Sequence, residues 1–568
     1  MFRRVLSLSV VVLLAGCSVN DSQPDPTRAA ESTTPTTRAI GAVASPDAYG
    51  ARVAEHVLRE GGNAVDAAVA TAFTLAVTYP EAGNIGGGGF MTIWFEGTPY
   101  FLDYRETAPG AAHRDMYLDS DGEIIENLSL IGAKASGVPG TVMGLWEAHQ
   151  KFGTLPWHDL VKPAITYAQN GFEVSDKQAV YRENLFAQLA QTTNFMDYFG
   201  ALEAGTPLVQ PELAQTLARI AQQGPHDFYQ GQTAELLVAQ MERDNGLITF
   251  EDLANYQALW REPLVEDWQE FQLVTAPPPS SGGIALGQLL GLKQRLENAF
   301  TDVPLNSAQY VHLIAEIEKR VFADRADYLG DPDFTPVPQT QLLDAQYLDR
   351  RAAEINPQAI SVTEDIQPGL ESHQTTHFSI LDKDGNAVSN TYTLNLSYGN
   401  GVVVEGAGFL LNNEMDDFSA KAGVPNAFGV VGSDANAIEP GKRMLSSMAP
   451  TIMVRDEQVA LVIGTPGGST IFTSIFQVIN NLYDYNLSLA DAVAAPRFHH
   501  QLLPRDQITI EPYAELDSNT QQALTERGYN LVTQGWNLGD IQAIRVRGER
   551  VEAVADPRGR GVATVFEY

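Results

Sequence analysis

The hydrophobic pattern of the first forty residues changes twice. An apolar run from Val5 to Leu14 follows two arginines and gives way to a stretch rich in Ser, Thr, Pro and Asp. The run is too short for a standard membrane span, and its order of charge, apolar core and small residues is typical of a secretory signal. The pattern therefore predicts a signal peptide over residues 1–16 and a flexible tether over residues 17–40.

Beyond the tether, the pattern becomes that of a folded chain. Ser45-Pro46-Asp47 is typical of a helix start, and Gly61-Gly62 should end that helix. Residues 64–79 are apolar on nearly every side, which indicates a helix buried in the core. Folded structure is thus expected from about residue 45.

Four consecutive glycines, Gly86–Gly89, follow the second helix. No Gly-Lys-Ser/Thr comes after them and no Gly-x-Gly-x-x-Gly stands at a strand-to-helix switch, so a tight turn with close backbone packing explains them better than a phosphate loop. The strands MTIWF and PYFLDYRE come next. Arg105 lies at the end of the second strand, where a cation needs a partner or an anionic ligand.

The two halves of the remaining chain differ in pattern. Residues 140–350 are predicted to be mainly helical, with Gly and Pro punctuation such as TAPPPSSGG at 275–283. After Thr375 the chain becomes rich in predicted strands, with helices near 470–495. Residues 382–386 have turn composition between two strand patterns and predict a hairpin.

This hairpin brings two threonines together. If it is centred near Asp384, Thr375 and Thr393 face each other, give or take one residue of register. Such pairs also occur in sheets for structural reasons alone. A threonine hydroxyl is a weak nucleophile that needs a base, and no Gly-x-Ser-x-Gly elbow is present. His377 on the same strand face is one candidate base. The other is the α-amine of Thr375, with an ordinary pKa of about 7.7–8.0, if the chain is cut before this residue.

Composition restricts the class of protein. A hydrophobic content of 44% with 19% charged residues describes a globular chain, and a formal net charge of −34 argues against nucleic-acid binding.

Cys17 is the only cysteine and ends Leu-Ala-Gly-Cys, which resembles the lipobox of bacterial lipoproteins. We therefore expect lipidation at Cys17, no disulfides, and attachment outside the cytoplasm by acyl chains. Ser18 favours the outer membrane, and a small buried hydrophobic residue is the alternative for Cys17.

Six sequence blocks occur in an order known from one family. They are LDYRETAP, QTTHFSILDKDGNAVSNTYTLN, GFLLNNEMDDFS, KRMLSSMAPT, GTPGGS and APRFHH. From about residue 40 onward the sequence resembles the gamma-glutamyltransferases (gamma-glutamyltranspeptidases), which are N-terminal nucleophile hydrolases. The resemblance implies an inactive precursor that cuts itself between Gln374 and Thr375, giving a large chain (41–374) and a small chain (375–568) that stay together as a heterodimer.

The resemblance also implies the fold and the reaction. The fold would be α+β, a four-layer αββα sandwich built jointly by both chains. Thr375 would attack the gamma-carbonyl of glutathione or a related compound and carry a gamma-glutamyl ester. Water or the amine of an amino acid or dipeptide would then take the glutamyl group. No metal or organic cofactor is expected.

Each block contributes implied site residues. Thr393 would orient Thr375, and the bare backbone of Gly467 and Gly468 would form an oxyanion hole. Pro-Gly-Gly taken alone is also a common turn. The implied substrate-binding residues are Arg105, Ser446 and Ser447 for the α-carboxylate, and Asn395, Glu414 and Asp417 for the α-ammonium.

One of these assignments depends on alignment to the motif. Asp417 is preferred to Asp416 on that basis alone. The segment NNEMDDF taken by itself would be a solvated acidic turn, since it lacks the spacing of a calcium loop. The insertion between Asp417 and Ser446 resembles the lid of some members, which have a tyrosine where Phe428 stands. Phenylalanine cannot form the tyrosine's hydrogen bond to the position of Asn395, so we expect a looser lid.

Two other functions stay open at this stage. A related acylase acting on β-lactam side chains would share the processing at Thr375 but would have less use for both Arg105 and Asp417. A non-catalytic peptide-binding surface lipoprotein would retain the pocket and stay uncut.

Overall fold

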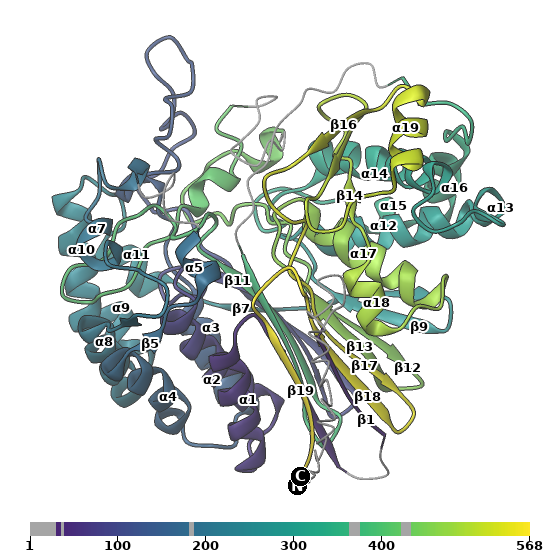
Figure 1. Ribbon diagram of the computed structural model, residues 1–568. Helices are drawn as coiled ribbons and strands as arrows, with labels where there is room; N and C mark the ends of the chain where they lie inside the picture. Colours follow the sequence, from purple (N-terminus) through teal and green to yellow (C-terminus); the bar gives the residue numbers. More distant parts are fainter. Residues whose placement is uncertain (1–29, 36–38, 181–186, 363–374, 422–432) are drawn as a thin grey trace, which may run out of the picture.

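Two stacked β-sheets form the centre of the molecule, and helices cover both outer faces (Figure 1). This computed structural model describes residues 30–35, 39–180, 187–362, 375–421 and 433–568. The arrangement is the α+β, four-layer αββα sandwich that was expected. Each sheet packs against the other sheet on its inner face and against helices on its outer face, so its central strands are buried on both faces.

The first sheet, here called the β10 sheet, is antiparallel throughout. Its strands, in spatial order, are β19 (Val562–Glu567), β2 (Ile40–Ser45), β10 (Thr376–Leu381), β11 (Ala387–Thr393), β3 (Gly88–Phe95), β4 (Thr98–Tyr104) and β7 (Leu259–Arg261). The segments before and after Thr375 both contribute strands, so neither could form this sheet alone.

The second sheet, here called the β13 sheet, is also antiparallel. Its strands, in spatial order, are β1 (Ala30–Pro35), β18 (Arg550–Ala555), β17 (Gln542–Arg547), β13 (Gln458–Gly464), β12 (Thr451–Arg455), β9 (Phe271–Thr275) and β8 (Leu264–Trp268). A buried apolar cluster that includes Ala42, Ile452 and Ile544 fills the space between the two sheets.

Helices from the first part of the chain cover the β10 sheet (Figure 1). They are α1 (Ala48–Arg59), α2 (Ala64–Thr78), α3 (Thr141–Phe152), α4 (Trp157–Asn170), α5 (Asp176–Val180), α7 (Phe195–Phe199), α8 (Pro211–Gln223), α9 (Pro225–Gln230), α10 (Gln232–Arg243) and α11 (Phe250–Asn255). Every residue of α2 is buried, and a capping box between Asn63 and Asp66 starts it, which confirms the predicted core helix.

The outer face of the β13 sheet is covered by a second set of helices, drawn from both parts of the chain. They are α12 (Gly282–Arg295), α13 (Glu297–Phe300), α14 (Ala308–Tyr328), α15 (Gln339–Leu343), α16 (Ala345–Ala353), α17 (Thr470–Tyr483), α18 (Leu489–Ala494) and α19 (Ser518–Arg527). Two small sheets complete the fold, β14 (Phe498–His499) with β15 (Gln507–Ile510) and β16 (Asn530–Thr533), and β5 (Phe172–Glu173) with β6 (Pro207–Leu208).

The start of the folded chain differs from the prediction. Residues 30–35 form strand β1 on β18, and β2 lies inside the β10 sheet, so the flexible tether does not extend to residue 40 and folding does not begin at residue 45. An edge strand is held by backbone hydrogen bonds, which a polar sequence makes as readily as an apolar one. The segment predicted as mainly helical also contains β7, β8 and β9.

Several predictions lie outside the described residues. They concern the signal peptide over 1–16, the lipidated Cys17, Gln374 on one side of the cut, and Phe428 in the lid. Across the residues described here, no helix is long and apolar enough to cross a membrane.

Candidate active site

Thr375 immediately precedes β10, which pairs with β11 at the centre of the β10 sheet. The register of β10 on β11 pairs Thr376 with Tyr392, which places Thr375 opposite Thr393 as the hairpin pattern predicted. The Thr375 hydroxyl donates to the Thr393 hydroxyl across 3.4 Å, and the Thr393 Oγ1 also accepts from the Asn395 amide at 2.8 Å. Thr375 is 8% exposed, so its hydroxyl lies at the edge of a cavity and not on the open surface.

His377, the alternative base, does not reach Thr375 through the hydrogen bonds of its ring. Its Nδ1 lies 2.8 Å from the Thr391 hydroxyl and its Nε2 lies 3.1 Å from the Ser379 hydroxyl, in the interior between the sheets. Burial lowers the pKa of His377 to about 3. The ring is therefore neutral at ordinary pH and is committed to structural hydrogen bonds.

Gly467 and Gly468 lie in the turn that leads from β13 into α17. Both have positive φ, 139° and 54°, which a side chain would strain. The carbonyl of Gly467 accepts from the backbone and hydroxyl of Thr470, at 3.0 and 2.8 Å. The turn thus lies at the positive end of the α17 dipole, where developing negative charge is stabilised.

The glycine run packs against the same strand end. A Cβ on Gly87 would lie 2.0 Å from the Thr393 carbonyl oxygen, and one on Gly86 would lie 2.1 Å from the Leu410 carbonyl oxygen. Asn84 also bonds the Thr393 carbonyl, at 2.8 Å. This confirms the prediction of close backbone packing and shows that the run supports Thr393.

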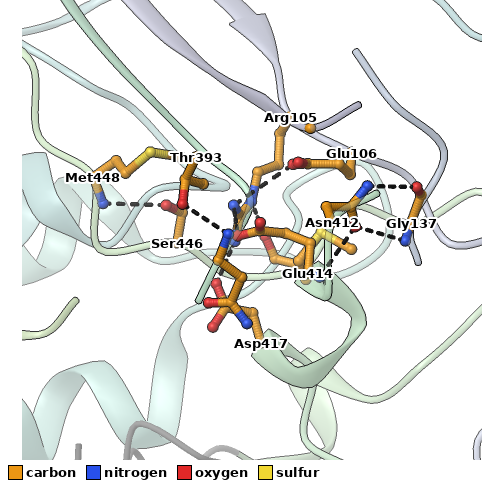
Figure 2. A network of polar contacts seen from close by, with 12 residues as sticks. Arg105, Glu106, Gly137, Thr393, Asn412, Glu414, Asp417, Ser446 and Met448 are labelled. Atoms are coloured by element: carbon orange, nitrogen blue, oxygen red, sulfur yellow. Dashed lines mark hydrogen bonds and ion pairs between the residues drawn. The ribbon is translucent and has the colours of Figure 1, made fainter. Parts of the chain in front are cut away.

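Arg105, at the end of β4, is surrounded by carboxylates (Figure 2). Its guanidinium forms ion pairs with Glu414 and Asp417, and its Nη1 lies 3.7 Å from the Glu106 carboxylate. Arg105 is fully buried. Burial alone would lower the pKa of Arg105, but the charges of Glu414, Asp417 and Glu106 outweigh it and raise the pKa.

The acidic side chains around Arg105 respond in the opposite way. Burial raises the pKa of Glu106 to about 7 and raises the pKa of Glu414 and of Asp417, with Arg105 opposing the rise in each case. One carboxylate oxygen of Glu414 is buried without a hydrogen-bond partner. This cluster therefore has capacity to bind a further cationic group.

The remaining predicted residues lie beside this cluster. Asn395 has a positive φ of 77°, and its side-chain amide donates to the Asn413 carbonyl at 2.9 Å. The Ser446 hydroxyl accepts from the Met448 amide at 3.1 Å. The neighbouring acid Asp416 bonds the Ser129 hydroxyl at 2.6 Å, so Asp417 is the one that contacts Arg105.

A single cavity, here called the Arg105 cavity, brings most of the predicted residues together. The open space inside it, including its mouth, amounts to about 380 Å³. Its lining comprises Arg105, Arg325, Thr375, Thr393, Asn395, Glu414, Asp417, Ser446, Ser447, Met448, Gly468, Ser469 and Ile471. All the substrate-binding residues expected from the sequence are among them.

A second cavity meets the first at Thr375. It is lined by Tyr79, Lys177, Thr375, Pro466, Gly467, Trp536, Asn537, Gly539, Asp540, Arg558, Gly559 and Arg560, and is here called the Trp536 cavity. Thr375 belongs to both cavities, with Gly468 on one side and Gly467 on the other. A molecule bound across Thr375 can therefore place one part in each cavity.

Sequence reasoning missed Arg325 on α14. It lines the Arg105 cavity and donates to the Ser447 hydroxyl at 3.1 Å. Its segment, EKRVFADRAD, has charges at all angles of the helix, so no single cation is distinguished in the pattern. Among the described residues, no group of three or more His, Cys, Asp or Glu side chains is placed to hold a metal ion.

Comparison with known proteins identifies the family. The sequence model of the gamma-glutamyltranspeptidase family matches residues 50–566. Glutathione hydrolase proenzymes of Pseudomonas aeruginosa and Escherichia coli are 68% and 44% identical, over 93% and 91% of this chain and 95% and 90% of their own.

Solved structures agree with the sequence relatives. The gamma-glutamyltranspeptidase of Pseudomonas nitroreducens complexed with L-DON is 65% identical, covering 56% of this chain and 96% of its own, with a TM-score of 0.56. A cephalosporin acylase from Bacillus halodurans is 26% identical, covering 98% and 100%, with a TM-score of 0.83. On these matches, the chain belongs to the gamma-glutamyltranspeptidase family.

Proposed function

We propose that this chain is an autoprocessed gamma-glutamyltransferase and glutathione hydrolase whose nucleophile is Thr375. After the chain is cut between Gln374 and Thr375, the new α-amine takes the proton of the Thr375 hydroxyl as the oxygen attacks the gamma-carbonyl. The C–N bond breaks, the amine product leaves with that proton, and a gamma-glutamyl ester remains on Thr375. Water or another amine then attacks the ester and restores the hydroxyl.

The observation that carries this proposal is the pairing of charges beside the nucleophile. The Arg105 cavity holds Thr375 together with a guanidinium and two carboxylates, those of Glu414 and Asp417. The glutamyl end of a donor carries an α-carboxylate and an α-ammonium, so it can replace the internal ion pairs with equivalent ones. Ser446 and Ser447 add hydroxyl donors for the carboxylate, and Asn395 adds an amide oxygen for the ammonium.

Two further features serve the proposed reaction, the oxyanion hole and the cavity for the amine. The Gly467–Gly468 turn at the start of α17 supplies backbone N–H groups for the negative charge that develops on the carbonyl oxygen. The Trp536 cavity lies on the other side of Thr375 and takes the departing amine and the incoming acceptor. The expected partners are glutathione and other gamma-glutamyl compounds, with water, amino acids or dipeptides as acceptors.

The test begins with the mass of the purified protein. Wild type should give two fragments, the smaller beginning at Thr375, and Thr375→Ala should stay as one chain. The processed enzyme should then release cysteinylglycine from glutathione and should act poorly on a glutaryl amide, which lacks the α-ammonium. One intact wild-type chain would contradict the proposal, and preference for the glutaryl amide would favour the related acylase.

We also propose that the protein is exported and held at the outer membrane, facing the periplasm or the cell surface, by acyl chains on Cys17. Support comes from the apolar run before Cys17 and the Leu-Ala-Gly-Cys sequence. Wild-type activity should sediment with membranes and be released by detergent, whereas a Cys17→Ser protein should not sediment. Equal distribution of the two proteins would contradict the anchor.

A further inference from the structure

A loop of the large-chain segment supports the two serines of the Arg105 cavity. The punctuation TAPPPSSGG forms the connection from β9 to α12, and its Ser280 makes a parallel bridge with Ser446. The Ser446 amide donates to the Pro279 carbonyl at 2.9 Å. In return, the amide and the hydroxyl of Ser281 both donate to the Ser446 carbonyl, at 2.7 and 2.8 Å. The backbone of Ser446 is therefore fixed from both sides.

The same loop also fixes the residues that follow Ser446. The Ser280 hydroxyl donates to the Met448 carbonyl at 2.6 Å. A Cβ on Gly282 would lie 2.7 Å from the Ser447 carbonyl oxygen, so only glycine allows the two segments to approach this closely. Ser280, Ser281 and the segment Ser446–Met448 thus form one buried unit, here called the serine platform.

Arg325 connects this platform to helix α14. Its Nε donates to the Ser281 hydroxyl at 3.0 Å and its Nη2 donates to the Ser447 hydroxyl at 3.1 Å. The residue is only 7% exposed, yet it lines the Arg105 cavity. Its charge also acts to lower the pKa of Asp417, although burial of Asp417 dominates. Arg325 therefore acts electrostatically inside the cavity as well as through the serine.

The charges in the cavity indicate a role for the guanidinium of Arg325. Arg105 is bordered by the carboxylates of Glu106, Glu414 and Asp417, which oppose the approach of a further anion. Arg325 lines the same cavity, and its Nη2 donates to the Ser447 hydroxyl at 3.1 Å. A donor carboxylate that accepts from Ser447 would therefore lie close to this second guanidinium as well as to Arg105, and would be attracted by its positive charge.

We propose that Arg325 is a positioning and specificity-determining residue for the α-carboxylate of the donor. It orients the Ser447 hydroxyl toward this carboxylate and adds a second positive charge to its binding site. The proposal rests on the proposed function, since it concerns the donor of that reaction. It assigns to Arg325 and the 275–283 loop a role in recognition beyond their place in the core.

The test compares donors with and without the group that Arg325 recognises. Arg325→Gln and Arg325→Lys are assayed with the gamma-glutamyl amide of an aromatic amine and with the corresponding 4-aminobutanoyl amide, which lacks only the α-carboxylate. Arg325→Gln should lower kcat/KM for the gamma-glutamyl donor about 10- to 100-fold, mainly through KM, because a hydrogen bond and a charge are lost. The carboxylate-free donor should change by no more than about threefold, and Arg325→Lys should fall between wild type and Arg325→Gln.

Arg320→Gln is the matched control, because Arg320 lies on the same helix but bonds Glu316 and Ser361 instead of the cavity. It should leave the ratio of the two donors unchanged. Equal losses on both donors in Arg325→Gln would overturn the proposal and make Arg325 a structural residue. If Arg325→Gln does not fold, Ser281→Ala removes one of its anchors and should produce a smaller loss with the same dependence on the carboxylate. A wild-type enzyme that does not prefer the gamma-glutamyl donor would instead contradict the proposed function.

Discussion

Thr375 and Thr393 stand opposite each other at the open end of the β10–β11 hairpin, with their hydroxyl oxygens 3.4 Å apart. The pair is set by the turn at residues 382–386, where the Asp382 carboxylate accepts from the amides of Asp384 and Asn386, both at 2.9 Å. The hydrogen bonds of the turn thus fix the register of the hairpin, and this register places the Thr393 hydroxyl beside the proposed nucleophile, Thr375.

Replacing Thr393 by Val should slow both self-cleavage and turnover. Val keeps the shape but removes the oxygen that contacts Thr375 and accepts from the Asn395 amide. We expect kcat to fall about 10- to 100-fold, since a buried donor left without its acceptor typically costs about 1–3 kcal/mol. The checks are the rate at which the small fragment appears on a denaturing gel and the kcat for a gamma-glutamyl amide.

Two further variants separate orientation from general damage to the strand. Thr393→Ser retains the oxygen and should keep most of the activity. Ser389→Ala, on the same strand, removes a 3.1 Å hydrogen bond to the Ile463 carbonyl far from Thr375 and should leave processing unchanged. Processing of Thr393→Val at the wild-type rate would show that Thr393 does not orient the nucleophile.

His377 should make stability, but not catalysis, depend on acid pH. Its pKa falls from 6.5 to about 3 on folding. The unfolded chain therefore binds a proton that the folded chain does not, and stability is full above pH 6.5 and is lost as pH falls toward 3. At pH 5 the loss from this residue should be about 2 kcal/mol, at about 1.4 kcal/mol per pH unit.

The measurement is the free energy of unfolding in urea at pH 7.5, 6 and 5, for wild type and His377→Gln. The variant should lose less stability than wild type over this range, and the acid limb of its kcat/KM profile should not shift. Parallel pH dependence of stability in the two proteins would show that His377 is not buried as a neutral ring. A shifted acid limb would restore it as a candidate base.

The sequence pattern predicted the parts of the structure that depend on interactions between residues close together in the chain. The hairpin register, the buried helix α2 and the close packing of Gly86–Gly89 all follow from the period of apolar residues, caps and turn residues. Arg105 was singled out as a cation at the end of an apolar strand, but its role in the site, and the choice of Asp417, came from short blocks of sequence that match a family. Chemistry alone could not have chosen Asp417 over Asp416.

Features that depend on distant contacts were not predictable in this way. Strand β1 is polar, and only its pairing with β18 shows that it belongs to a sheet. Arg325 lies in a helix with charges on every side, and its role depends on Ser447, which is 122 residues away in the chain. The TAPPPSSGG loop has the composition of an ordinary connection between two elements. Its contacts with the Ser446 segment follow from tertiary packing.

Gly87→Ala should prevent correct assembly of the site. The added Cβ would lie 2.0 Å from the Thr393 carbonyl oxygen and 2.8 Å from the Asn84 amide oxygen, so β11 must move. Backbone displacement of this kind typically costs about 1–3 kcal/mol. We expect a lower melting temperature and slow or absent cleavage at Thr375. Gly535→Ala is the control, because its Cβ would meet no atom within 4 Å. Normal processing of Gly87→Ala would mean that Thr393 tolerates displacement.

Arg105→Gln should affect binding and stability in separable ways. Removing the guanidinium takes away the proposed carboxylate partner, so KM for a gamma-glutamyl amide should rise at least about 100-fold. It also leaves the buried Glu414 and the partly exposed Asp417 without their cation. Loss of one partner of a buried pair typically costs about 3–5 kcal/mol. Adding Glu414→Gln to Arg105→Gln removes one of the uncompensated carboxylates. The double variant should therefore recover part of the free energy of unfolding while its KM stays high, because no cation has been returned to the cavity. Joint recovery of stability and KM would show that Arg105 acts only by holding the acidic side chains in place.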